Sequence, residues 1–162
     1  MRTKKYIVYW DSCVFISLIT NEIRPNHEMD GVYACVDKIL KGQVLLMVLR
    51  DVLFEEVQLR TLESAENFRK LMMRQGIEMP SKDFRIEKLA SELRNYYDQK
   101  GPQKLGERDS LHLAAAIHYK ANAFYTFDEG KKGGIGLLSL NGNVAGYPLL
   151  ICKPPVTQYK LF

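Results

Sequence analysis

Two apolar runs in the chain are each followed by an aspartate. Asp11 follows "YIVYW" and Asp128 follows "AFYTF". Aspartate is disfavoured inside strands, and α/β proteins collect functional side chains at the carboxyl ends of buried strands. An aspartate at such a place can also be an ordinary turn residue or helix cap. The two aspartates therefore become candidates for a chemical site only if other acids join them.

Two further acids occupy comparable positions. Glu55 or Glu56 lies early in the helix expected after the run "QVLLMVL", and Asp109 opens the alanine-rich segment "RDSLHLAAAIHYKA". In a parallel sheet the carboxyl ends of the strands and the following helix N-termini share one edge, so acids at these positions would converge. Taken singly, each acid has an ordinary explanation as a turn residue, a first-turn acid or a solvated helix acid. Their order along the chain is what favours a site.

Converged carboxylates repel each other unless they share protons or bind a cation. Ligands that are all oxygen suit Mg²⁺ or Mn²⁺ rather than zinc. Such an ion commonly binds substrate phosphate as well, which predicts phosphoryl-transfer chemistry. The sequence has no P-loop and no Gly-x-Ser-x-Gly motif. Its three cysteines and three histidines lack zinc spacing, so we expect buried thiols and packed or solvated histidines.

The elements that would position the acids alternate between strands and helices. This order predicts an α/β fold with a parallel sheet. Gly42 is the expected stop of the second helix, Asp51 the N-cap of the third helical region, Ser64 a possible break within it, and Ser81 or Asp83 the cap of the next helix. Apolar residues of that helix are Phe84, Leu89, Leu93, Tyr96 and Tyr97. The expected strands cover 6–10, 43–49, 76–80, 123–127 and 147–152, and the expected helices cover 12–20, 29–41, 51–74, about 84–97 and 108–121.

The bulk composition is that of a soluble globular protein. The 162 residues are 46% hydrophobic and 26% charged, which predicts one domain over 1–162 with a real core. No apolar run approaches the roughly 20 residues of a membrane span. The apolar stretch near the N-terminus is too short for a signal peptide. We therefore expect a cytoplasmic protein with no membrane association.

The positive charge is concentrated at the C-terminal end. Lysines and arginines number 23 against 19 acids, and the segment from residue 131 onward contains four lysines and no acid. These are Lys131, Lys132, Lys153 and Lys160. The distribution allows a polyanionic partner without requiring one. Because Lys131 and Lys132 follow Asp128 closely, they are candidates for contact with substrate.

Three segments together resemble the PIN-domain nucleases, in particular the VapC-type toxins of bacterial and archaeal toxin–antitoxin pairs. "YWDSCVFISLI" is similar to their opening strand–Asp–Ser motif, and "VLRDVLFEEV" to the segment that carries their glutamate. "ERDSLHLAAAIHYKANAFYTFDE" is the most specific match. The resemblance covers about residues 6–132 and leaves a basic tail, 133–162, with a last strand near 147–152. It implies a PIN-like three-layer sandwich with a central, mainly parallel sheet.

The resemblance also implies roles for individual residues. Asp11, Glu56, Asp109 and Asp128 would be the catalytic, metal-binding acids, with Ser12 and Thr126 as polar support. Glu56 is preferred to Glu55 because the family's glutamate directly precedes an apolar residue, here Val57. The family often has Asn two places after its first Asp, where this chain has Cys13. The implied activity is Mg²⁺- or Mn²⁺-dependent hydrolysis of RNA, with a cognate antitoxin and a homodimer as expected partners.

Two other functions remain open at this point. One is a non-catalytic PIN-like module that binds RNA or protein through the basic tail, which the replacement of Asn by Cys13 leaves possible. The other is a metal-dependent phosphatase on a different α/β fold. The second is disfavoured because the chain lacks an Asp-x-Asp pair after its first strand.

Overall fold

A five-stranded parallel sheet forms the centre of the computed structural model, which describes residues 4–57, 62–73 and 76–156. The strands are β1 (Tyr6–Trp10), β2 (Val44–Met47), β3 (Ile77–Glu78), β4 (Ala123–Tyr125) and β5 (Ile151–Cys152). Their spatial order is β3-β2-β1-β4-β5, and every pairing is parallel. The predicted α/β class is confirmed. Because β1 lies between β2 and β4, its carboxyl end is the point where the strand order reverses, and ligands of such sheets bind there.

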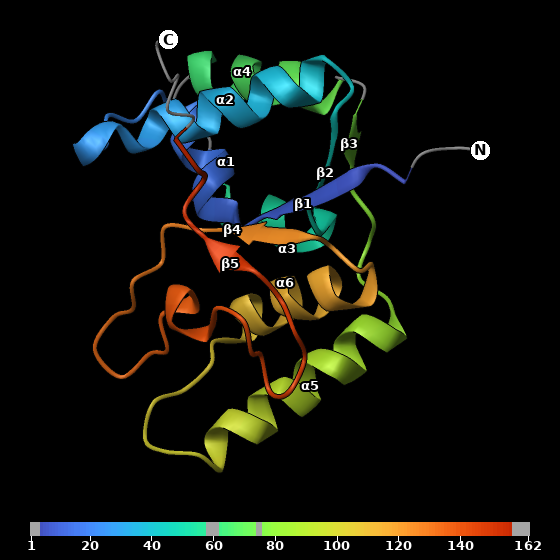
Figure 1. Cartoon of the computed structure of the whole chain (residues 1–162), viewed down its shortest axis with the longest axis vertical. Helices are drawn as coiled ribbons and strands as arrows, with labels where there is room; N and C mark the ends of the chain where they lie inside the picture. Colours follow the sequence, from blue (N-terminus) through green and yellow to red (C-terminus); the bar gives the residue numbers. More distant parts are fainter. Residues whose placement is uncertain (1–3, 58–61, 74–75, 157–162) are drawn as a thin grey trace, which may run out of the picture.

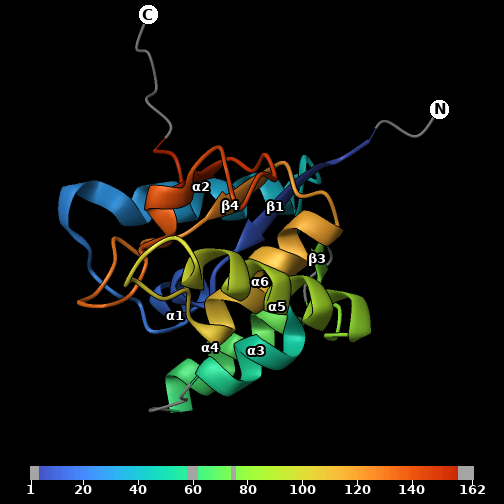
Figure 2. The ribbon, with the colours of Figure 1, turned by 90° about the horizontal axis from the view of Figure 1, so that it is seen from below.

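Helices cover both faces of this sheet (Figure 1). Helices α1 (Ser12–Ile19), α2 (Glu28–Leu40) and α4 (Leu62–Met72) lie on one face. Helices α5 (Phe84–Asp98) and α6 (Glu107–His118) pack against each other on the opposite face, which Figure 2 presents to the viewer. The short α3 (Arg50–Glu56) follows β2. Two 3-10 turns, η1 (Pro25–His27) and η2 (Leu137–Leu140), complete the described elements.

Strand β1 shows why the sheet is buried on both sides. Tyr9 packs into the core shared with α5 and α6, whereas Val8 and Trp10 pack into the core shared with α1 and α2. All three are at most 1% exposed. A continuous apolar run is the expected sequence of such a strand, because both of its faces are covered.

The structure corrects two expectations about the region after β2. Helix α3 begins at Arg50 with Leu49 as its N-cap, and the Asp51 carboxylate accepts instead from the backbone N–H of Lys82 at 2.6 Å. Ser64 lies inside α4 and does not interrupt it. The region does form two helices, but the first ends at Glu56, because Val57 has an extended backbone conformation, and the second begins at Leu62. Glu56 is therefore the last residue of a helix.

The cap of α5 is Asp83, whose Oδ1 accepts from the backbone N–H of Ile86 at 3.0 Å. The apolar side expected for this helix was partly wrong. Phe84 is 77% exposed at the first helical position, and the buried residues are Ile86, Ala90 and Leu93. Of the expected apolar side, Leu93 is buried and Leu89 and Tyr97 pack partly buried against the core, whereas Phe84 and Tyr96 are exposed. No helix in the described ranges is both long and apolar enough to span a bilayer.

The segment after β5 crosses the start of α2. Lys153 Nζ bonds Glu28 Oε1 at 2.7 Å and Glu129 Oε1 at 2.8 Å, so it is paired and not a free cation of the basic tail. Pro154 and Pro155 pass so close to Gly31 that a β-carbon there would overlap the carbonyl oxygen of Pro154. The segment thus joins α2 to the loop after β4. Lys160 lies outside the described residues.

Replacing Gly31 by alanine tests this close approach. We expect Gly31→Ala to lower the free energy of unfolding by about 1–3 kcal/mol, because the new methyl group forces α2 and the segment apart. Chemical denaturation measures the change. Gly101→Ala is the matched control, since nothing lies within 4 Å of a β-carbon at that position. Equal stability of the two variants would contradict the packing described.

Candidate active site

The four predicted acids line one open cleft of about 830 Å³. Asp11 follows β1, Glu56 ends α3, Asp109 lies in the first turn of α6, and Asp128 lies in the loop after β4. They come from four separate segments, and the parallel sheet brings them together at the carboxyl ends of its strands. Lys131 and Lys132 line the same cleft.

Asp11 is buried, with 5% of its surface exposed, and its side chain does not cap α1 although it holds the N-cap position. Its Oδ2 accepts from Thr126 Oγ1 at 2.8 Å and from Cys13 Sγ at 3.4 Å. Its Oδ1 lies 3.7 Å from His112 Nε2. One carboxylate oxygen is thus held by neutral donors, and the other faces the remaining site residues.

Thr126 and Cys13 also connect Asp11 to the loop after β4. Thr126 Oγ1 accepts from the backbone N–H of Asp128 at 3.0 Å while it donates to Asp11. Cys13 Sγ accepts from the backbone N–H of Phe127 at 3.5 Å. Burial and then the Asp11 charge raise the pKa of the Cys13 thiol, which keeps it a donor at neutral pH. Thr126 and Cys13 therefore each link Asp11 to the loop after β4.

Asp128 has a structural role in addition to its place in the cleft. Its Oδ1 accepts from the backbone N–H of Gly130 at 2.9 Å, and its Oδ2 accepts from that of Leu137 at 3.2 Å. Through these bonds Asp128 joins the two ends of the loop that carries Lys131 and Lys132. Each carboxylate oxygen has a further lone pair, so loop anchoring and cation binding are compatible.

The pKa of Asp109 reflects both its burial and the negative charge of the cleft. Burial, followed by the charges of Asp11 and Asp128, raises the pKa of Asp109 to about 7, with His112 opposing the shift. A surface carboxyl group at a helix N-terminus would have a low pKa. The raised value is the sign expected of carboxylates that are held together without a cation.

Glu55 and Glu56 point to different environments. Glu56 Oε1 lies 3.1 Å from His112 Nε2, with the Glu56 side chain 21% exposed. Glu55 has a 53% exposed side chain, and its Oε2 lies 3.7 Å from Arg108 Nε. Only Glu56 lines the cleft, which agrees with the preference for it in the sequence.

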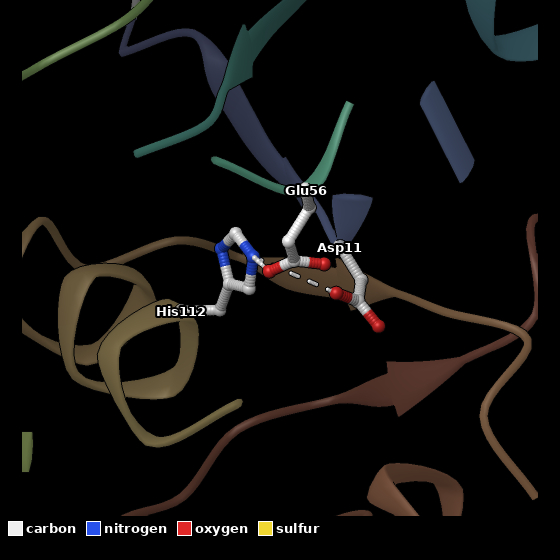
Figure 3. A group of neighbouring side chains, drawn as sticks. All are labelled: Asp11, Glu56 and His112. Atoms are coloured by element: carbon white, nitrogen blue, oxygen red, sulfur yellow. Dashed lines mark hydrogen bonds and ion pairs between the residues drawn. The ribbon is translucent and has the colours of Figure 1, made fainter. Parts of the chain in front are cut away.

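His112 is the site residue that the sequence reasoning missed. Its ring is fully buried, and Figure 3 shows it beside Glu56 and Asp11. Ser12 Oγ lies 2.9 Å from His112 Nε2, so Ser12 contacts the site through this ring. The available signal was the spacing Asp109-x-x-His112, which puts both side chains on one face of α6.

The donor set fits a hard divalent cation. Ligand atoms of Asp11, Glu56 and His112 lie within 4.8 Å of one another. Asp109 and Asp128 add two more carboxylates to the same cleft. Carboxylate oxygens are the protein ligands that Mg²⁺ and Mn²⁺ prefer, and the raised pKa of Asp109 marks negative charge that a cation would neutralise.

Comparison with known proteins identifies the family. The family model described as "PIN domain" matches residues 8–132, so the chain belongs to the PIN-domain family. No curated protein sequence matches it.

Solved structures share the fold at low sequence identity. The crystal structure of VapBC2 from Rickettsia felis bound to a promoter DNA fragment contains a chain with a TM-score of 0.61 and 17% identity. That match covers 90% of this chain and 96% of the other. The crystal structure of FitAcB from Neisseria gonorrhoeae gives a TM-score of 0.54 at 17% identity, covering 76% and 88%. Both support the PIN-like three-layer fold.

The raised pKa of Asp109 predicts a pH-dependent stability for the metal-free protein. Between its unfolded pKa near 4 and its folded pKa of about 7, the folded state binds more protons than the unfolded state, so stability falls as pH rises through this window. Asp109→Asn removes the effect. In EDTA we expect the variant to exceed the wild type by about 1–3 kcal/mol at pH 8 and to match it near pH 4.

Denaturation at both pH values, with and without Mg²⁺, measures the difference. Excess Mg²⁺ should stabilise the wild type by mass action and leave the variant unchanged. Asp98→Asn is a suitable control, because Asp98 lies outside the cleft and pairs with Lys104 at 3.2 Å. A gap between wild type and Asp109→Asn that is the same at pH 4 and pH 8 would rule out this account of the charge cluster.

Proposed function

We propose that the chain is a Mg²⁺- or Mn²⁺-dependent endoribonuclease of the cytoplasm and the toxin of a type II toxin–antitoxin pair. The observation that carries the proposal is the convergence of Asp11, Glu56, Asp109 and Asp128 in one cleft, with the pKa of Asp109 raised to about 7. Membership of the PIN-domain family supports a nuclease. RNA as the substrate follows from the resemblance to VapC-type toxins.

In this mechanism the four acids would hold the cation. A divalent cation bound there would supply a water of lowered pKa and would neutralise charge on the phosphodiester. Thr126 and Cys13 fix the Asp11 carboxylate, so that one of its oxygens stays directed at the site. Asp128 joins the two ends of its loop through hydrogen bonds to Gly130 and Leu137, and this loop carries Lys131 and Lys132 at the cleft. Those ammonium groups bind the phosphates that flank the scissile bond.

The partner part of the proposal is supported by the structural neighbours. The chain's likeness to VapBC2 and FitAcB, two toxin–antitoxin systems, supports a protein antitoxin as partner. A homodimer is the assembly that the resemblance implies. Co-purification with the product of an adjacent short reading frame tests the antitoxin directly.

Two measurements test the catalytic proposal: RNA cleavage with and without a divalent metal, and the cleavage rates of variants at Glu56 and Glu55. We expect single-stranded RNA to be cleaved with Mg²⁺ or Mn²⁺ and to remain intact in EDTA. Glu56→Gln should lower the cleavage rate at least tenfold, about 1.4 kcal/mol in barrier height, because a cation ligand loses its charge. Glu55→Gln is the matched control and should have little effect, since Glu55 faces Arg108 outside the cleft.

Two results would reject catalysis at this site. RNA binding without cleavage at any divalent concentration would favour the non-catalytic module. Full activity of a folded Glu56→Gln protein, with loss in Glu55→Gln, would assign the cation to the other face of α3.

The lysines beside Asp128 predict a salt dependence for RNA binding. Each phosphate contact contributes about 0.7 to the slope of log affinity against log salt for a single strand. Lys131→Ala combined with Lys132→Ala should therefore weaken binding and reduce the slope by about 1.4. The matched control is Lys38→Ala with Lys88→Ala, two exposed lysines outside the cleft. An unchanged slope for the Lys131/Lys132 variant would show that these residues do not contact the substrate.

A further inference from the structure

A buried chain of hydrogen bonds leads from the backbone to Glu56. The backbone N–H of Leu49 donates to Tyr9 Oη at 2.9 Å, and Tyr9 Oη lies 2.6 Å from His112 Nδ1. On the other side of the ring, His112 Nε2 lies 3.1 Å from Glu56 Oε1 and 2.9 Å from Ser12 Oγ. Tyr9, Ser12 and His112 are fully buried, so these groups are shielded from bulk solvent and bond to each other.

These contacts decide where the ring proton lies. Leu49 N–H already donates to Tyr9 Oη, so the hydroxyl proton of Tyr9 is available for His112 Nδ1, and Nε2 then carries the ring proton. A proton on Nδ1 alone would leave the Tyr9 hydroxyl proton without an acceptor among the described residues. It would also turn the lone pair of Nε2 toward the Glu56 carboxylate. The imidazolium form carries a proton on Nε2 as well.

A protonated Nε2 has no lone pair for a metal ion. Although His112 lies close enough to Asp11 and Glu56 to complete a three-residue ligand set, its nitrogen faces the acids as a donor. Figure 3 shows the ring directed at the Glu56 carboxylate, with Asp11 beyond it. The ring can hold a carboxylate in place, and it does not compete for the cation.

Helix α3 explains why Glu56 needs such a partner. The helix has seven residues, of which only Val52 and Leu53 are buried, and it ends at Glu56 itself. A last-turn side chain on so short a helix is weakly held by the helix alone. The Tyr9–His112 pair contacts α3 at both ends, at its N-cap Leu49 and at its last residue Glu56.

We infer that His112 is a positioning residue that, with its tautomer set by Tyr9, orients Glu56 for cation binding without ligating the cation. The inference rests on the proposed function only in taking Glu56 as a ligand of the cation. Partners of this kind typically change metal affinity by about 10- to 100-fold when they are removed.

The wild-type protein gives the first test. Nitrogen-15 NMR of the histidine rings should show His112 protonated on Nε2, and pulsed EPR of bound Mn²⁺ should show no directly coordinated nitrogen. A deprotonated Nε2 in the metal-free protein, or a nitrogen bound to Mn²⁺, overturns the inference and makes His112 a ligand.

Variants give the second test, read as Mn²⁺ affinity without RNA. We expect His112→Leu to weaken Mn²⁺ binding by about 10- to 100-fold, and His112→Gln to restore part of it through its amide N–H. His118→Leu, on the same helix outside the cleft, is the matched control. Equal Mn²⁺ affinity of folded His112→Leu and wild-type protein overturns the inference, as does a His112→Gln protein that binds no better than His112→Leu.

Tyr9→Phe decides the matter if His112→Leu does not fold. It keeps the ring stacked on Phe124, with centroids 5.3 Å apart, and removes only the hydroxyl group. Tyr97→Phe is its control, because the Tyr97 hydroxyl also accepts from a backbone N–H, that of Ala145 at 2.9 Å. We expect weaker Mn²⁺ binding only in Tyr9→Phe, and an equal effect of both variants overturns the inference.

The ribonuclease proposal and the positioning role of His112 can be told apart by experiment. A wild-type protein that binds Mn²⁺ but cleaves no RNA rejects the ribonuclease and leaves the role of His112 to be decided by the affinities. A wild-type protein that binds no Mn²⁺ overturns both.

Discussion

The confinement of four carboxylates to one partly buried cleft is the constraint on which the rest of the structure depends. Burial, followed by the charges of Asp11 and Asp128, raises the pKa of Asp109 to about 7, which disfavours its ionised form by a few kcal/mol. The fold sets this energetic cost, because β1 lies between β2 and β4 and the carboxyl ends of the three parallel strands lie at one edge of the sheet. Their positions are therefore held by the two apolar cores, and their charge is left for a ligand to neutralise.

Tyr9 shows how core packing and site geometry are combined in one residue. Its ring stacks on Phe124 within the core that includes Ile86, while its hydroxyl bonds Leu49 N–H and His112. The polar end of a buried tyrosine must find partners, because an unmade hydrogen bond in the core is costly. Here the partners lead to Glu56. The same side chain therefore stabilises the sheet and sets the surroundings of the cleft.

The sequence predicted the parallel sheet and the convergence of the acids because both follow from position along the chain. Asp11 comes directly after β1, Asp128 lies in the loop after β4, and Asp109 lies in the first turn of α6, so a parallel sheet is enough to bring them together. The parts that could not be predicted depend on tertiary partners. Asp51 of α3 accepts from Lys82 in the loop before α5, and Lys153 pairs with Glu28 and Glu129. His112 gains its role only from its contacts with Tyr9 and Glu56. No local pattern encodes those pairs.

The groups that donate hydrogen bonds to Asp11 and Asp128 are neutral. Thr126 and Cys13 hold Asp11, and backbone N–H groups hold Asp128. Within residues 4–57, 62–73 and 76–156, no lysine or arginine forms an ion pair with any of the four acids. A built-in ammonium or guanidinium partner would neutralise the carboxylates and compete with a cation. Hydrogen bonds from neutral donors fix the orientation of Asp11 and Asp128 and leave their charge in place, so that this charge can bind a divalent ion.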